Sequence, residues 1–243
     1  MGLSANLSRP LAFGSLALST VSLSACAGPL STLDPAGPAA ASIAEIWYVM
    51  LIGGTFLFLM VMVLFALAFL KPNWRWSEGA NRAWLLYGGF VMPVVVLTAL
   101  LLYALTRGEG LLAHPSAEGR VVVEARGERW QWVFTYPDAP EIEGTIDVLH
   151  VPAGRPVDVR ITTRDVIHAF WVPRLAGKMD AIPGHTNTLR IEADNPGIYR
   201  GICSEYCGFG HSGMRFDVVA YAPDEYEAAR AGGFADPIAE VGQ

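Results

Sequence analysis

A short stretch near the carboxyl end, residues 203–214, gathers side chains that bind soft metals. Cys203, Cys207, His211 and Met214 follow one another at spacings of four, four and three residues. Thiolate, imidazole and thioether together form the ligand set that selects copper for electron transfer. Zinc sites rarely recruit a methionine, and a redox-active dithiol would need neither the histidine nor the methionine. A second imidazole must come from elsewhere in the chain, and His168 is the candidate.

The first 25 residues have the pattern of a lipoprotein export signal. Arg9 supplies positive charge, an apolar run covers residues 11–23, and small residues precede Cys26, as a signal peptidase requires. We expect residues 1–25 to be removed and Cys26 to carry the lipid. A third membrane helix is the alternative, but the run is short for a span and contains Gly14 and several serines.

An exported protein meets an oxidising compartment, so a structural disulfide between Cys203 and Cys207 is the alternative to a metal site. A bridge over so short a loop closes little chain entropy and would contribute little stability. It would also leave His211 and Met214 without a role. The pattern therefore favours copper, although a metal-free form could oxidise to that disulfide.

Two apolar runs without a charged residue, 46–70 and 83–106, predict a transmembrane helical hairpin over residues 43–106. Each run is long enough to cross about 30 Å of hydrocarbon with some tilt. Tryptophan and tyrosine residues flank both runs, as at membrane interfaces. Pro93 should kink the second helix unless neighbouring groups satisfy the freed carbonyl. Residues 26–42 would form an extracytoplasmic amino-terminal segment.

The short loop between the two runs carries Lys71, Arg75 and Arg82 against Glu78 alone. Positive residues in short loops stay cytoplasmic, so both helix ends at this loop should face inward. The lipid attachment at Cys26 independently requires an amino terminus outside. With two spans, the carboxyl-terminal part then lies outside as well.

Residues 107–243 predict one all-β domain with a loose tail. Short runs of β-branched and aromatic residues alternate with Gly, Pro, Asp and Asn punctuation, which is typical of a sandwich or a Greek-key barrel. A short helix over 223–230 should close the domain. The seven predicted strands cover residues 120–125, 130–136, 145–151, 156–162, 188–192, 197–202 and 215–221.

The same domain is acidic, with 20 Asp and Glu against 13 Lys and Arg in residues 107–243. This balance repels nucleic acid and excludes it as a partner. Beside a copper site, an acidic surface favours a basic redox protein as partner, because complementary potentials raise the encounter rate.

Taken together, these residues resemble subunit II of the haem–copper respiratory oxidases, of the cytochrome c oxidase type with a dinuclear CuA centre. The resemblance implies a cupredoxin-like Greek-key barrel after the hairpin. The two thiolates would bridge both coppers and each histidine would bind one copper, with a thioether and a backbone carbonyl as weak axial ligands. The implied copper ligands are His168, Cys203, Glu205 through its carbonyl, Cys207, His211 and Met214.

The resemblance also implies roles outside the copper ligands. Trp130, in an aromatic segment that matches the family in part, would receive electrons from cytochrome c, while Trp132, Phe134 and Tyr136 are expected to be packing residues. The Glu205 side chain would reach a magnesium or manganese ion shared with subunit I, and Asp180 would lie at that interface. The three remaining histidines are predicted to be surface or packing residues: His114, His150 and His185.

The implied complex is an aa3-like cytochrome c oxidase in the bacterial inner membrane, with the amino terminus and the copper domain on the periplasmic side. Subunits I and III would be partners, a basic c-type cytochrome the donor, and haem would be held only by the partner subunit that reduces oxygen to water. A CuA subunit of a nitric oxide reductase and a copper-binding lipoprotein are the alternatives. The quinol oxidase branch lacks the copper ligands. The chain departs from the family at Leu86, where relatives often carry a glutamate.

Overall fold

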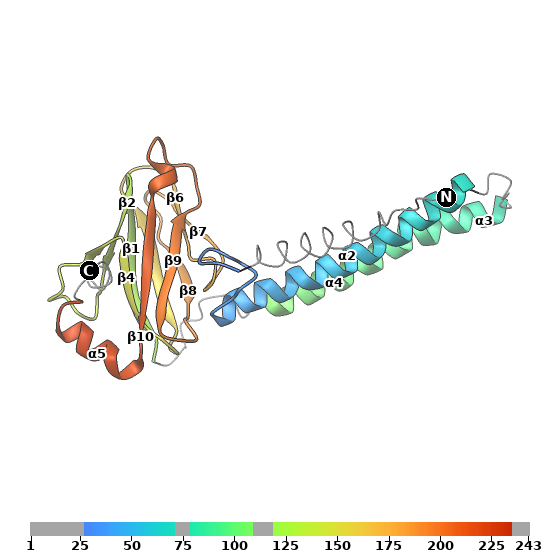
Figure 1. Cartoon of the computed structure of the whole chain (residues 1–243). Helices are drawn as coiled ribbons and strands as arrows, with labels where there is room; N and C mark the ends of the chain where they lie inside the picture. The colour runs from blue at the N-terminus through green and yellow to red at the C-terminus, as the bar shows by residue number, and fades with distance from the viewer. Residues whose placement is uncertain (1–26, 71–77, 109–118, 235–243) are drawn as a thin grey trace, which may run out of the picture. The chain divides into compact units, whose positions relative to one another are not determined.

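The computed structural model describes residues 27–70, 78–108 and 119–234 (Figure 1). The predictions for Cys26, Lys71, Arg75 and His114 concern residues outside these ranges. The chain divides into two compact units: residues 41–114 form the first, and the segments before and after them form the second.

The first unit is built on two long apolar helical stretches, Pro38–Leu70 and Gly79–Gly108, each long and apolar enough to cross a membrane. The predicted pair of spans is confirmed in length and composition. The first helix, α2 (Pro38–Leu70), begins before the predicted residue 43, because a proline is well suited to the first helical position and alanines follow it. An ion pair of 2.7 Å joins Glu45 near its start to Arg107 near the end of the second stretch, so the two run antiparallel.

The second stretch is composite, because three helical types follow one another in it. It comprises α3 (Glu78–Ala83), the π-helix η1 (Trp84–Val91) and α4 (Met92–Gly108). Pro93 has no N–H and its ring would press on the carbonyl four residues back, and the wider π-turn just before it relieves both problems. The N–H of Met92 accordingly bonds to the carbonyl of Tyr87, five residues back.

The second unit is an all-β domain of two five-stranded sheets, so the predicted cupredoxin-like Greek-key fold is confirmed. The first sheet has the strand order β3-β2-β1-β5-β8, with β1 and β5 parallel. The second sheet has the order β4-β10-β9-β6-β7, with β4 and β10 parallel. The closing helix α5 (Pro223–Ala231) matches its prediction. The strands are β1 (Val121–Glu128), β2 (Gln131–Thr135), β3 (Thr145–Ile146), β4 (Val148–Pro152), β5 (Val157–Thr163), β6 (His168–Trp171), β7 (Met179–Ala181), β8 (Asn187–Ile191), β9 (Gly197–Cys203) and β10 (Arg215–Tyr221).

The strand predictions were incomplete at three places. The predicted strand 145–151 is divided into β3 and β4 at Asp147, whose φ of 57° breaks the extended backbone. The strands β6 and β7 were not predicted, because both are short and the three residues after His168 in β6 are apolar without alternation. The omission of β6 matters because this strand carries His168.

Aromatic side chains fill the space between the sheets. Trp132, Phe134 and Tyr136 alternate along one strand and are buried, which confirms that they are packing residues. Burial of each such side chain contributes about 1.5–3 kcal/mol. Phe216 lies directly across from Gly201, where an added Cβ would stand 2.2 Å from the phenyl ring. Because Gly201 has no side chain, the ring of Phe216 occupies the space that a side chain at position 201 would fill.

The segment before α2 belongs to the β domain and is not a separate arm. The N–H of Ala36 bonds to the carbonyl of Arg174, and the N–H of Asp194 bonds to the carbonyl of Ala36. Gly37 passes so close that an added Cβ would lie 2.1 Å from the carbonyl oxygen of Glu192. Residues 34–37 therefore form part of the β domain's packing.

Candidate metal centre

The stretch 203–214 connects β9 to β10 at one end of the sandwich, called the metal end below. Its two ends are joined, because the N–H of Cys203 bonds to the carbonyl of Met214 at 3.0 Å. Strand β6 lies beside β9 with Phe170 opposite Cys203. The N–H of Ser204 bonds to the carbonyl of Ala169, so the loop is also fastened to the strand that carries His168. Two segments distant in sequence are thereby joined by backbone bonds.

The two thiols and two imidazoles come together as the sequence predicts. Both cysteines are free, with their sulfurs 3.8 Å apart. Nδ1 of His168 lies 3.8 Å from the sulfur of Cys203, and Nδ1 of His211 lies 3.6 Å from the sulfur of Cys207. Each thiol is therefore flanked by one imidazole nitrogen, and His168, Cys203 and Cys207 lie close enough together to hold a metal ion.

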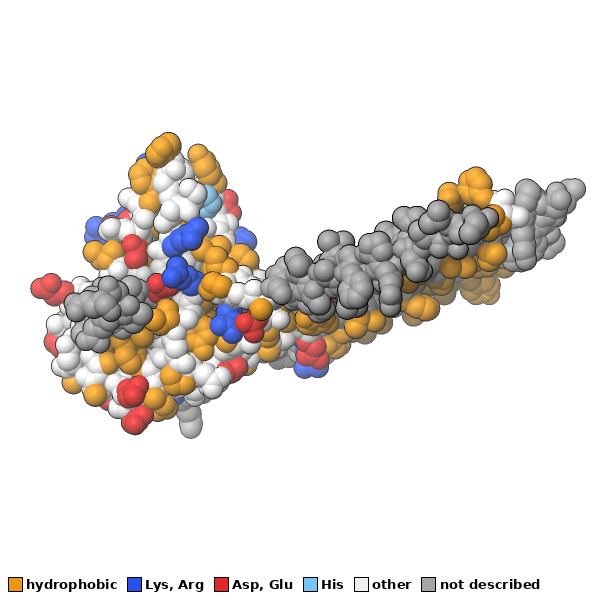
Figure 2. All heavy atoms as spheres, viewed as in Figure 1, with side chains coloured by type: hydrophobic (Ala, Val, Ile, Leu, Met, Phe, Trp, Pro, Cys, Tyr) orange, Lys and Arg blue, Asp and Glu red, His pale blue; other side chains and the backbone are white. Residues whose placement is uncertain are grey.

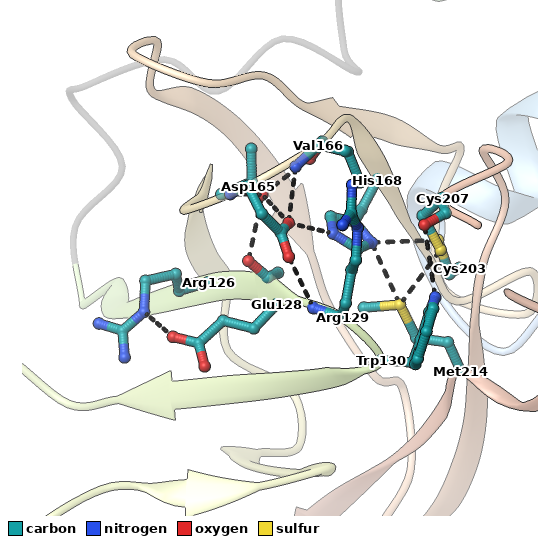
Figure 3. A network of polar contacts seen from close by, with 12 residues as sticks. Arg126, Glu128, Arg129, Trp130, Asp165, Val166, His168, Cys203, Cys207 and Met214 are labelled. Carbon is teal, nitrogen blue, oxygen red and sulfur yellow. Dashed lines mark hydrogen bonds and ion pairs between the residues drawn. The ribbon is translucent and has the colours of Figure 1, made fainter. Parts of the chain in front are cut away.

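The two weaker donors lie at the same place. The sulfur of Met214 is 3.2 Å from Nδ1 of His168 and 3.7 Å from the sulfur of Cys207. The thiol of Cys203 donates to the backbone carbonyl of Glu205 at 3.3 Å. All six predicted ligands thus contribute donor atoms to one cluster, most of it visible in Figure 3. The soft sulfur and imidazole donors fit copper.

The buried position of the thiols disfavours their thiolate form unless a cation lies beside them. Burial, followed by the neighbouring Cys203, raises the pKa of the Cys207 thiol to about 11. A metal ion reverses this effect, because metal coordination deprotonates a thiol outright. Binding of a metal would therefore convert the buried Cys207 thiol to a thiolate, with release of its proton.

Asp165 is a site residue that the sequence reasoning missed. Its Oδ1 lies 2.9 Å from Nε2 of His168. Its carboxylate also accepts from the N–H groups of Val166 and Arg129, at 2.7 and 2.9 Å (Figure 3), and from the hydroxyl of Thr163 at 3.2 Å. Burial alone would raise the pKa of Asp165, but the hydrogen bonds from His168, Val166 and Arg129 outweigh it and lower the pKa to about 2. The only signal in the sequence was an aspartate three residues before the histidine.

The role of Asp165 is to hold the imidazole. A carboxylate that accepts the Nε2–H leaves the lone pair of Nδ1 directed at the sulfurs, and it raises the basicity of the ring as a ligand. On the opposite side, the ring lies over Gly127, where an added Cβ would be 2.9 Å from the imidazole. His168 is therefore positioned by its hydrogen bond to Asp165 on one side and by the bare backbone of Gly127 on the other.

Replacement of Asp165 by alanine should weaken copper binding by about 10–100-fold, the usual cost of removing a group that orients a metal ligand. The measurement is competition for copper with a chelator of known affinity, followed by the absorption of the bound metal. Asp138→Asn, an exposed aspartate on the loop after β2, is the matched control and should have no effect. Unchanged copper affinity in Asp165→Ala would show that His168 is held by packing alone.

Trp130 lies on the turn between β1 and β2, with 41% of its surface exposed. Its indole Nε1–H donates to the backbone carbonyl of Cys207 at 3.3 Å. The ring rests against Gly210, where an added Cβ would lie 2.4 Å from an indole carbon, and beside Gly208. One side chain thus links the protein surface to a residue of the thiol pair through a single hydrogen bond.

Comparison with known proteins agrees with this geometry. A family model described as cytochrome c oxidase subunit II, periplasmic domain, matches residues 143–221. The cytochrome c oxidase subunit 2 of Alkalihalophilus pseudofirmus is 32% identical over 229 residues, which cover 88% of this chain and 65% of the relative. The chain belongs to the cytochrome c oxidase subunit II family. The same subunit of Thermostichus vulcanus is 40% identical over 55% of this chain and 40% of its own length.

A quinol oxidase subunit and a solved periplasmic domain are also similar to this chain. The quinol oxidase subunit 2 of Bacillus cereus is 28% identical over 84% of this chain and 73% of its own length. The crystal structure of the periplasmic domain of subunit II of cytochrome oxidase from Bradyrhizobium japonicum is 30% identical. The superposition covers 50% of this chain and 99% of the Bradyrhizobium domain, with a TM-score of 0.44. This chain spans 40% of the length of the Thermostichus vulcanus subunit and 65% of the length of the Alkalihalophilus pseudofirmus subunit. The activity of a whole oxidase is therefore proposed for this chain below.

For this member of the cytochrome c oxidase subunit II family, the described residues gather His, Cys and carboxylate donors closely enough for a metal only at His168, Cys203 and Cys207. Glu205 directs its side chain to the exterior, and Asp180 on β7 accepts from Lys178 at 3.0 Å. Among the residues that the structure describes, neither carboxylate therefore joins a second metal cluster. A magnesium or manganese site and the Asp180 interface stay predictions, since both require another subunit.

The remaining histidines were predicted to be packing or surface residues, and two of them are described. His150 is buried, with Nδ1 at 2.9 Å from the hydroxyl of Tyr221 and its ring stacked on Phe234 at 4.6 Å. His185 is exposed on the turn after β7. Both observations agree with the prediction.

Proposed function

We propose that this chain is the electron-accepting subunit of an aa3-like cytochrome c oxidase, which takes electrons from a c-type cytochrome for the reduction of oxygen in subunit I. The observation that carries the proposal is the pairing of each thiol with one imidazole nitrogen, at 3.8 and 3.6 Å, around sulfurs 3.8 Å apart. A dinuclear CuA centre, when bound, would accept one electron at a time and release it to the haem of the partner subunit. The residues that would hold it are His168, Cys203, Glu205, Cys207, His211 and Met214.

The protein's own contribution is rigidity and a short route from the surface. The donor loop is fastened at both of its ends and to β6, so its donor atoms need not move when charge is gained or lost. Asp165 holds the imidazole of His168, and Trp130 connects the exterior to the backbone of Cys207. Weak axial donors from Met214 and Glu205 would tune the potential of the metal without building the site.

The same proposal gives the chain its place in the cell. Cys26 would carry a lipid, two helices would cross the bacterial inner membrane, and the amino terminus and the copper domain would face the periplasm. Subunit I, with which Glu205 would share a magnesium or manganese ion near Asp180, and subunit III would be its partners. The net charge of the domain alone favours a basic c-type cytochrome as donor.

The test is the metal content of the purified full-length chain after loading with copper. We expect two coppers per chain, a purple colour and a paramagnetic resonance spectrum in which one electron is shared by both metals. One copper per chain, or the spectrum of a single localised Cu(II), would contradict the dinuclear site. Co-purification with a catalytic subunit that consumes oxygen would separate an oxidase from a nitric oxide reductase.

A further inference from the structure

The charged side chains of the β domain are distributed unevenly between its two ends. The end of the β domain opposite the metal is called the far end below. Four strands end there, β2, β4, β8 and β10, and β9 begins there. The segments that lie together at the far end are therefore 136–144, 153–156, 192–196 and 222–232. These four segments hold eight carboxylates and two arginines, and Arg120, just before β1, adds a third arginine at this far end. Figure 2 shows several of the acidic side chains on the half of the domain that bears α5. The acidic residues of the far end are Asp138, Glu141, Glu143, Glu192, Asp194, Asp224, Glu225 and Glu227.

The metal end has a different balance: residues 126–130, 164–168, 178–186 and 203–215 hold four arginines and one lysine against four carboxylates. The carboxylates are already engaged within the chain. Glu128 pairs with Arg126 at 2.9 Å and with Arg164 at 3.5 Å, and Asp165 is bonded to His168. Asp180 pairs with Lys178 at 3.0 Å, and Glu205 interacts electrostatically with the same lysine.

Three of the four arginines of the metal end remain available to a partner. The side chains of Arg129 and Arg215 are exposed, and Arg164 keeps 68% of its side chain in solvent despite its ion pair. Arg129 directly precedes Trp130, and Arg215 directly follows the ligand Met214. A protein approaching Trp130 therefore meets three exposed arginines against two exposed carboxylates, those of Asp165 and Glu205.

Distance prevents the far carboxylates from acting at Trp130. The seven residues of β10 separate the two ends by about 20 Å at a rise of about 3.3 Å per residue. The Debye length at physiological ionic strength is about 8 Å, so charges at the far end are largely screened at the metal end. The net charge of the domain therefore does not describe the surface on which an electron donor must dock.

The loops of the metal end expose apolar side chains instead. Trp130, Ile167, Tyr206 and Phe209, here called the apolar tip, have exposed fractions of 41, 44, 76 and 96%. Phe209 stands between the two glycines that border the Trp130 ring, and Ile167 adjoins His168. Large apolar side chains this exposed beside a functional group mark an interaction surface.

We propose that the electron donor docks on the apolar tip by apolar contact, and that it is a small cytochrome whose haem edge lies in an apolar face with a neutral or acidic rim. This inference rests on the proposed electron-accepting function, and it replaces the basic donor predicted from net charge. Arg129, Arg164 and Arg215 would face the rim of the donor, and Phe209 would be the main apolar contact.

The experiment measures the dissociation constant between the full-length chain, with and without copper, and two probes. One probe is a basic mitochondrial cytochrome c, and the other is the same protein after succinylation, which converts its lysines to carboxylates. We expect the succinylated probe to bind at least as tightly as the basic one, with Kd changing less than about threefold between low and physiological salt. A basic probe that binds more than about tenfold tighter at low salt would overturn the proposal.

Variants locate the contact. Phe209→Ser should raise Kd by about tenfold or more for both probes, as loss of a central aromatic contact does. Ile198→Ser, an equally apolar site with 49% exposure at the start of β9, is the control and should leave Kd unchanged. Arg129→Glu should weaken binding of the succinylated probe, whereas Glu225→Lys at the far end should affect neither probe. An effect of Glu225→Lys that exceeds that of Arg129→Glu would place docking at the acidic end and overturn the proposal.

The two proposals can fail separately. Binding is measured in the copper-free chain as well, so absence of a dinuclear centre would overturn the proposed function and still leave the docking comparison decisive. Conversely, a correct copper centre with tight, salt-sensitive binding of the basic probe would overturn the docking inference alone.

Discussion

Replacement of Cys207 by serine should abolish the dinuclear copper centre altogether. The sulfur of Cys207 lies within 3.8 Å of three other donors, those of Cys203, His211 and Met214, so its loss removes a shared ligand of both metal positions. A hydroxyl is a hard, weakly acidic donor and does not replace a thiolate toward copper. The measurement is metal content together with the paramagnetic resonance spectrum, in which the signal of the shared electron should disappear.

Met214→Leu is the matched comparison, because it also removes a sulfur from the same cluster. An axial thioether tunes the potential of copper without building the site. We therefore expect this variant to keep two coppers and the shared-electron spectrum, with a changed reduction potential. If Cys207→Ser retained the dinuclear spectrum, or if Met214→Leu lost it as completely as Cys207→Ser, the bridging role of the thiols would be wrong.

Replacement of Trp130 by alanine should slow reduction of the copper by a c-type cytochrome by about tenfold or more, while the copper spectrum stays unchanged. The indole is exposed for the donor and bonded to the backbone of Cys207, but it contributes no ligand atom. Loss of a central aromatic contact alone costs a complex about tenfold or more in stability. Stopped-flow mixing of the reduced cytochrome with the copper-loaded full-length chain gives the rate.

Trp130→Phe separates the two contributions of the indole. Phenylalanine keeps an aromatic surface over Gly210 but cannot donate a hydrogen bond to the carbonyl of Cys207. A rate near that of Trp130→Ala would assign the effect to the hydrogen-bonded route, and a rate near the parental one would assign it to docking. Parental rates in both variants would mean that electrons reach the metal elsewhere and that Trp130 is a packing residue.

The sequence predicted the parts of the site that are local. Cys203, Cys207, His211 and Met214 occupy one loop, so their spacing alone brings them together, and soft donors in that order have few other uses. His168 could be proposed only because a second imidazole was needed. What brings it close is the pairing of β6 with β9, a strand pairing that a four-residue strand without polar alternation does not reveal.

Features that depend on the folded arrangement of side chains could not be predicted. Asp165 looks like an ordinary loop carboxylate until the fold places it against Nε2 of His168. The net charge of the domain was counted correctly, but a count does not say where the charges lie. The directions of the strands place eight of the acidic residues at the end away from Trp130. The π-helix before Pro93 was anticipated only as a kink, since the sequence does not show which carbonyl would be freed.

Three rings at the metal end lie over glycines from three different segments. His168 lies over Gly127 on β1, Phe216 over Gly201 on β9, and Trp130 over Gly210 in the ligand loop. Only the last of these glycines would travel with residues 203–214 if that loop were grafted onto another β-sandwich. A recipient with ordinary side chains at the other two positions would receive the cysteines and still displace the imidazole and the packed phenyl ring. The centre is therefore a property of the whole sandwich and not a transferable loop.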